Sequence, residues 1–136
     1  MPSLTSSQIF DLAAQLSAMA EAVESKRSTY RRGSPEAGRL ASYRIALSNA
    51  STQMAGTGIQ VTLDEIAPHY EAMLDTLRDL KSELHKEAQL VRIFSIADAV
   101  LEITAASFVG DVPGIVKAIG IAQRLLTAKP PESDEE

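Results

Sequence analysis

Residues 69–109 read HYEAMLDTLRDLKSELHKEAQLVRIFSIADAVLEITAASFV, and this stretch decides the fold. It holds neither Gly nor Pro, so no residue in it forces a helix to stop. Apolar side chains recur along it at close to heptad spacing: Leu77, Leu80, Leu84, Val91, Phe94, Leu101, Ala105 and Phe108. Glu87 and Asp98 interrupt this seam. The pattern predicts one long helix, or two helices with a soft joint near residues 87–92.

The two alternatives imply different molecular shapes. A single helix over residues 69–109 would be about 60 Å long, because each helical residue rises 1.5 Å. That length is large for a domain of 136 residues. We therefore expect either an elongated molecule or a break in this helix.

A first helix is expected near the N-terminus. Thr5 and Gln8 have the spacing of a capping box, in which each side chain binds the other residue's free backbone N–H. Apolar residues then follow at helical spacing, so the helix should run to about Tyr30. Gly33 is placed to close it in the left-handed conformation that glycine adopts easily.

A second helix should begin directly after this glycine. Ser34 is a favourable N-cap, and Pro35 suits the first helical position. The sequence Ala-Gly-Thr-Gly at residues 55–58 should end the helix. Because the turn between the two helices is short, they should form an antiparallel hairpin.

Two further segments complete the predicted fold. Thr62 and Glu65 form a second capping box, and Pro68 predicts a bend or a short helical turn before the long helix. Asp111 is a suitable N-cap for a final helix over residues 112–127.

These patterns together predict an all-α fold. We expect an elongated bundle of four or five helices, with the N-terminal hairpin packed on the long helix and on a final apolar helix. Residues 1–128 should form a single helical domain. Residues 129–136 contain two prolines and four acidic side chains, which predicts a disordered acidic tail.

Composition excludes several classes of protein. The chain has no Cys, so it holds neither a disulfide nor a thiolate metal site. Its net charge of −5 argues against a dedicated nucleic-acid binder. The N-terminus has no basic and apolar segments of a signal peptide, so we expect a cytoplasmic location, leaving secretion by a signal-independent route open.

One candidate partner interface is an acidic ridge on the long helix. Five acidic residues stand at four-residue steps and should share one helix face: Glu71, Asp75, Asp79, Glu83 and Glu87. Such a face is often simply solvated. It also suits a small immunity or inhibitor protein that docks against a basic site of its partner.

The other candidate interface is the final helix, which is apolar nearly all round. We expect Ile115, Ile119 and Leu126 to contact a partner, because one facing helix cannot cover so much apolar surface. Small residues at four-residue spacing, Gly110, Gly114, Ala118 and Ala122, would let another helix approach closely. Our leading hypothesis is a non-enzymatic protein-interaction or assembly protein that forms homo-oligomers.

A membrane-active protein is the alternative from another class. In this alternative, residues 93–127 form an apolar helical hairpin that inserts into a bilayer, as in helical pore formers. However, Asp98 and Glu102 interrupt its first arm, and neither arm has the ~20 apolar residues needed to span a bilayer.

Signals for enzyme chemistry are weak. His69 and His85 are the only histidines, and the chain has neither a Gly-rich phosphate loop nor a nucleophile elbow. Asp98 and Glu102 lie one turn apart in an apolar setting, so they are either general acid–base groups or members of ion pairs with Arg92, Lys117 or Arg124. We expect no enzymatic activity, cofactor, metal ion or small-molecule substrate.

Overall fold

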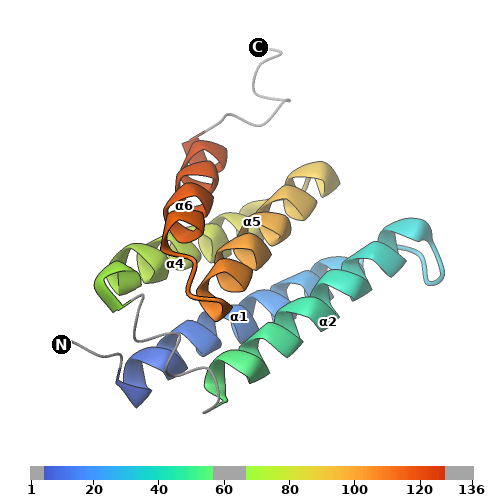
Figure 1. The fold of residues 1–136 in the computed structure, drawn as a ribbon. Helices are drawn as coiled ribbons and strands as arrows, with labels where there is room; N and C mark the ends of the chain where they lie inside the picture. Colours follow the sequence, from blue (N-terminus) through green and yellow to red (C-terminus); the bar gives the residue numbers. More distant parts are fainter. Residues whose placement is uncertain (1–4, 57–66, 128–136) are drawn as a thin grey trace.

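The computed structural model describes residues 5–56 and 67–127, and every regular element in these two ranges is helical (Figure 1). The elements follow in the order α1 (Ser6–Arg27), α2 (Pro35–Ala55), a short 3₁₀ turn η2 (Ala67–His69), α4 (Tyr70–Lys86), α5 (Leu90–Phe108) and α6 (Val112–Thr127). The predicted all-α bundle is therefore confirmed. The predicted capping box of Thr62 and Glu65 lies outside the described residues.

The helices stack in three layers (Figure 1). Helices α1 and α2 form the predicted antiparallel hairpin and contact each other along their length. Helix α4 packs on α1, and α5 packs on α2 and α4. Helix α6 covers the outer side of α5 and α4, so the layer of α4 and α5 is enclosed from both sides.

Local signals set the ends of the first two helices. Thr5 N–H donates to Gln8 Oε1 at 2.9 Å and Gln8 N–H to Thr5 Oγ1 at 3.1 Å, which confirms the capping box. Ser34 Oγ accepts from Ala37 N–H at 3.1 Å, so the predicted N-cap of α2 is also present. Helix α1 ends at Arg27, before the predicted end, and Gly33, with φ of 84°, shapes the turn instead of closing the helix.

The long central stretch forms two helices with a break between them, which is the second of the two predicted alternatives. Helix α4 ends at Lys86 and α5 begins at Leu90, and residues 87–89 between them are not helical. We call this segment the joint. Pro68 lies in η2, which is the short helical turn expected ahead of the long helix.

The joint changes the face of the helix that is buried, and here the prediction was wrong. Helix α4 buries its predicted residues Leu77, Leu80 and Leu84. Helix α5 instead buries a different set: Ile93, Ile96, Val100 and Ile103. Of the predicted seam residues of α5, Val91 is 77% exposed and Ala105 is also exposed, while Phe94, Leu101 and Phe108 are only partly buried against the core. Three non-helical residues rotate α5 relative to α4, so the apolar stripe shifts by two residues at the joint.

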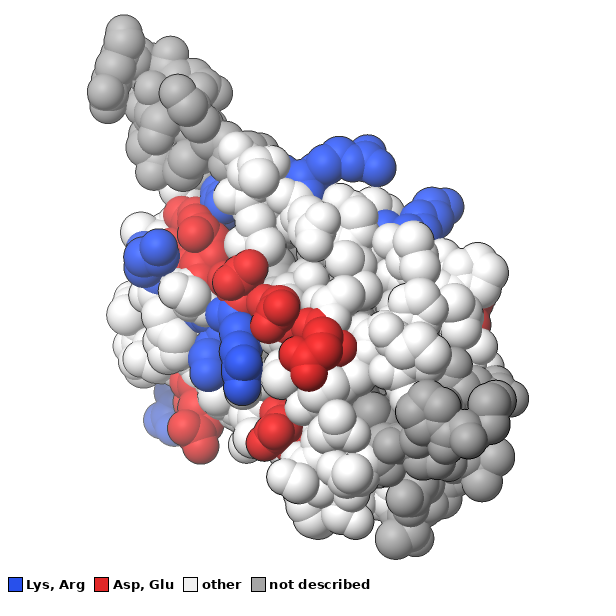
Figure 2. Space-filling view, turned by 90° about the vertical axis from the view of Figure 1, so that its left-hand side faces the viewer, with Lys and Arg blue, Asp and Glu red and all other residues white. Residues whose placement is uncertain are grey.

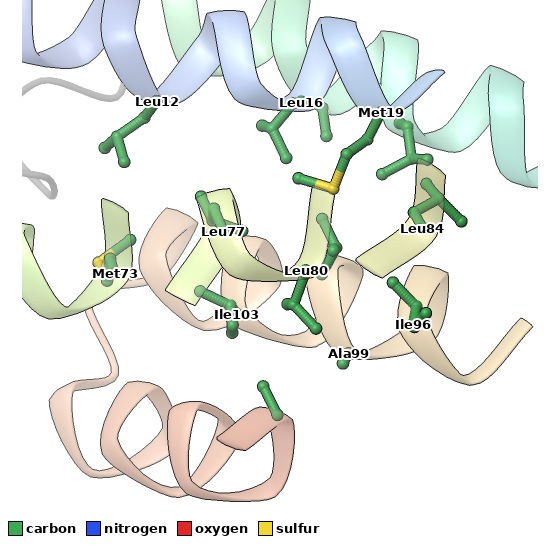
Figure 3. Close-up of a cluster of buried hydrophobic side chains, with 14 of the residues drawn as sticks. Leu12, Leu16, Met19, Met73, Leu77, Leu80, Leu84, Ile96, Ala99 and Ile103 are labelled. Carbon is green, nitrogen blue, oxygen red and sulfur yellow. The ribbon is translucent and has the colours of Figure 1, made fainter. Parts of the chain in front are cut away.

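The core lies between α1 and the layer of α4 and α5 (Figure 3). Leu12, Leu16 and Met19 project from α1 toward α4 and α5. They meet residues from both of these helices: Met73, Leu77, Leu80 and Leu84 of α4, and Ile96 and Ile103 of α5. The low aromatic content leaves this core to Leu, Ile, Met and Ala.

Leu80 and Val91 belong to the same predicted stripe but have opposite environments, and this difference can be measured. Leu80→Ala should lower the free energy of unfolding by about 2–5 kcal/mol, because it opens a cavity at a fully buried position. Val91→Ala should change it by less than about 0.5 kcal/mol. Urea titration followed by circular dichroism measures both values, and similar losses in the two variants would contradict the described packing.

Candidate interaction site

The acidic ridge on α4 is shorter than predicted. Glu71, Asp75 and Asp79 are exposed on this helix, but the Glu83 side chain is only 24% exposed and Glu87 is buried. Glu87 also follows the last residue of α4, so it no longer shares the helix face. Figure 2, which views the side where α4 begins, shows acidic side chains interleaved with Lys and Arg. The expectation of five exposed acidic residues is therefore corrected to three.

Arg92 on α5 binds Glu83 and Glu87, the two predicted ridge residues that are not exposed. Its Nε donates to Glu87 Oε2 at 2.7 Å, and one terminal nitrogen donates to Glu83 Oε2 at 3.0 Å. The other terminal nitrogen donates to the carbonyl oxygen of Leu125 near the end of α6, at 3.2 Å. Arg92 is only 7% exposed. One buried guanidinium thus connects α4, the joint, α5 and α6.

Lys26 of α1 and the Glu87 side chain also form hydrogen bonds with the backbone of the joint. Lys26 Nζ donates to the carbonyl oxygens of His85 and Glu87. Glu87 Oε1 accepts from the backbone N–H of Ala88 at 3.1 Å and of Gln89 at 2.9 Å. These bonds satisfy backbone groups that lose their helical partners where the helix breaks.

Electrostatics keep this buried pair ionised. Burial raises the pKa of the Glu87 carboxyl, but the N–H of Gln89, the Arg92 guanidinium and the N–H of Ala88 outweigh it and leave the pKa below its usual value. Burial likewise lowers the pKa of Arg92, while its bonds to Glu87 and Glu83 raise it by more. The joint therefore carries a charged cluster that this chain neutralises internally.

The apolar partner residues predicted on α6 are mostly part of the chain's own core. Ile115 is fully buried, Ile119 is 8% exposed, and Leu126 is half-buried. We therefore correct the expectation that Ile115 and Ile119 face a partner. The polar residues Lys117, Gln123 and Arg124 mark the exposed side of α6, and the prediction did not use them to choose the buried face. The large apolar side chains that α6 exposes are instead Val116 and Ile121.

A shallow groove runs along the outer side of the α5–α6 hairpin. It has two hollows of about 440 and 300 Å³, which share Glu102 and Ile121 as lining residues. Small residues and a few longer side chains line the rest: Ser95, Asp98, Ala99, Ala105, Ala106, Gly114, Lys117, Ala118 and Leu125. We call this feature the α5–α6 groove. A third hollow, of about 360 Å³, lies between α1 and α2 beside Glu24 and Arg44.

The turn between α5 and α6 fixes the end of this groove. Gly110 has φ of 68°, and Asp111 Oδ1 accepts from Gly114 N–H at 3.0 Å as the predicted N-cap. A Cβ atom at position 114 would lie 2.3 Å from Asp111 Oδ2, so only glycine leaves room for this cap. This cap sets where α6 begins.

An aromatic cluster next to the groove joins α5 to α2. Tyr43 O–H donates to Asp98 Oδ1 at 2.7 Å, and the Tyr43 and Phe94 rings lie 5.4 Å apart. The Arg39 guanidinium lies 4.3 Å from the centre of the Phe94 ring, in cation–π contact. Burial, helped by the Asp98 carboxylate, raises the pKa of Tyr43. Asp98 therefore meets a tyrosine of α2, which the sequence did not indicate.

Comparisons with models of protein families, with curated proteins and with solved structures found no match. Among the helices within residues 5–56 and 67–127, none has both the length and the apolarity that crossing a bilayer requires. The same ranges contain no group of three or more His, Asp or Glu side chains placed to hold a metal ion.

The charged joint predicts how stability depends on pH. Because the pKa of Glu87 is lower in the folded chain than in the unfolded one, its contribution is present above the unfolded value of about 4.5 and is lost as pH falls through the folded value. The free energy of unfolding of wild type should therefore exceed that of Glu87→Gln at pH 7, and this difference should shrink below about pH 5. Urea titrations across this range measure it. A difference that stays constant down to pH 3 would contradict the assignment.

Proposed function

We propose that this chain is a non-catalytic assembly protein that pairs with a second copy of itself through the α5–α6 groove. The observation that carries the proposal is the lining of the groove. Ala105, Ala106 and Gly114 present little side-chain volume at its surface, and such residues let a second helix approach closely. A helix laid into an apolar groove is a common mode of protein recognition.

One large apolar side chain in the groove supports the same proposal. Ile121 lines both hollows and is 39% exposed. Water-exposed apolar side chains of this size stabilise an interface when a partner covers them.

The charges beside the groove favour a second copy as the partner. The α5 side carries Asp98 and Glu102, and the α6 side carries Lys117 and Arg124, all four of them exposed. A two-fold axis that runs parallel to the groove would place the acidic α5 side of one chain opposite the basic α6 side of the other.

Docking of α4 on a basic partner is a weaker candidate. It retains Glu71, Asp75 and Asp79, but Arg78 and Lys81 stand among them on the same helix. No contact in the described residues favours docking through α4 over pairing through the α5–α6 groove.

The groove can be tested by light scattering on the purified chain. Wild type should show a dimer that grows with concentration, and Ile121→Glu should weaken this dimer at least tenfold, about 1.4 kcal/mol, because it buries an unpaired charge. Gln123→Glu is the matched control, since it adds the same charge at an exposed position of α6 outside the groove. A wild type that stays monomeric at every concentration would contradict the proposal.

A charge exchange tests the two-fold arrangement separately. Lys117→Glu and Glu102→Lys should each weaken the dimer by about two- to fivefold, the size expected for exposed ion pairs. The double variant should recover wild-type association, because each new charge then meets its opposite on the other copy. Additive losses in the double variant would rule out this pairing of the two sides.

A further inference from the structure

The joint between α4 and α5 has no residue that breaks a helix. Lys86, Glu87, Ala88, Gln89 and Leu90 all have high helix propensity, and sharp helix breaks normally occur at Pro, at Gly or at a π-bulge. Side-chain bonds therefore hold the break open. Two of them are local, from the Gln89 N–H to Glu87 and from Arg92 to Glu87, and one is tertiary, from Lys26 of α1 to the carbonyl oxygen of Glu87.

A straight helix through the joint would satisfy the same backbone groups. The N–H groups of Ala88, Gln89 and Leu90 would bond to the carbonyls four residues earlier, as in any α-helix. Glu87 would then no longer be needed as an acceptor, and Lys26 would lose the carbonyl of His85. The joint thus has two hydrogen-bonded arrangements, one bent and one straight, and local preference favours the straight one.

Helix α5 also carries a second apolar stripe, which is in phase with the core face of α4. In the bent form it buries Ile93, Ile96 and Val100. In a straight helix the other stripe, beginning at Val91 and Phe94, continues the core face of α4 without a shift in phase. In the bent form Val91 is 77% exposed and Ala105 is exposed, whereas Phe94, Leu101 and Phe108 are partly buried against the core.

We propose that the joint straightens and that two copies of the chain then exchange their α5–α6 hairpins. Straightening carries α5 and α6 away from α1, α2 and α4 of the same chain. In the exchanged dimer, the hairpin of each copy packs on these helices of the other copy and re-forms the same contacts between chains. Only the joint differs between the two states. This inference goes beyond groove pairing, because it rests on the joint.

Leu90→Pro should block exchange. Leu90 is the first residue of α5, where proline is favoured, and Gln89 before it is extended, with φ of −81° and ψ of 124°, as proline requires. In a straight helix the same proline would stand in the interior and cost about 3 kcal/mol or more. Leu90→Ala is the matched control, because it removes the same apolar contacts without restricting the backbone.

Glu87→Ala should favour exchange. It removes the acceptor that stabilises the bent joint and supplies a strong helix former to the straight one. After both proteins are refolded at high concentration and diluted until wild type is monomeric, light scattering should show at least a tenfold larger dimer fraction for the variant than for wild type. Circular dichroism should show helix content unchanged or higher, which separates exchange from unfolding.

Cross-linking distinguishes exchange from groove pairing. The natural chain lacks cysteine, so Tyr43→Cys with Asp98→Cys, added to Glu87→Ala, places two thiols across the α2–α5 contact for a bifunctional maleimide. In an exchanged dimer these thiols belong to different chains, and a covalent dimer should appear on a denaturing gel. Glu24→Cys with Arg44→Cys is the control pair, because α1 and α2 stay in one chain in both states.

Each outcome decides the question. Exchange is established if the 43/98 pair gives covalent dimers and the 24/44 pair does not. These dimers should disappear with Leu90→Pro and remain with Leu90→Ala. If light scattering shows a dimer but the 43/98 pair cross-links only within one chain, exchange is overturned. That result remains consistent with groove pairing. Glu87→Ala that remains monomeric also overturns exchange, whereas a monomeric wild type bears on the proposed function alone.

Discussion

The ion pair between Glu87 and Arg92 is the contact on which the arrangement of the helices depends. It lies where a helix without Pro or Gly nevertheless stops, and it holds the turn that brings α5 and α6 back over α4. Breaking a buried pair of this kind by removing one partner typically costs about 3–5 kcal/mol. Helix propensity differs among ordinary residues by less than about 0.7 kcal/mol each, so a joint of this length cannot outweigh the pair.

Apolar burial acts in the same direction as the ion pair. Ile93, Ile96, Val100 and Ile103 are buried only because the joint rotates α5. Each such side chain contributes about 1.5–3 kcal/mol when it is taken out of water. Within one chain, tertiary packing therefore overrides the local preference for a continuous helix. The preference for a continuous helix acts only at the joint, whereas the apolar burial of α5 depends on the helices that it packs on. In an exchanged dimer, a second copy would supply those helices.

Much of the fold follows from short-range signals in the sequence. The capping box of Thr5 and Gln8, the N-caps Ser34 and Asp111, and the short turn at Pro68 depend on neighbours within a few residues, and the structure has all of them. The buried face of α5 depended on rotation at the joint, which no local pattern sets. For α6 the polar residues Lys117, Gln123 and Arg124 mark the exposed side of the helix, but Val116 and Ile121 are exposed although they are as apolar as the buried Ile115 and Ile119.

The candidate site shows the same limit. Regular spacing correctly placed Glu71, Asp75 and Asp79 on one face of α4, since that argument needs only helix geometry. It failed for Glu83 and Glu87, whose partner Arg92 approaches across the break. Small residues such as Gly114 and Ala118 indicated a close approach of helices, but only the packing of α5 on α6 shows that part of this surface remains open as a groove.

The order of the helices along the chain has a consequence for how the protein folds. Helices α1 and α2 pair with their sequence neighbour, and so do α5 and α6, so most contacts join residues that are close in the chain. Chains of this topology close short loops first and reach the native state quickly, in microseconds to milliseconds for many helical bundles. The two hairpins can therefore form independently, and α4 is the segment whose docking on α1 brings them together at the end.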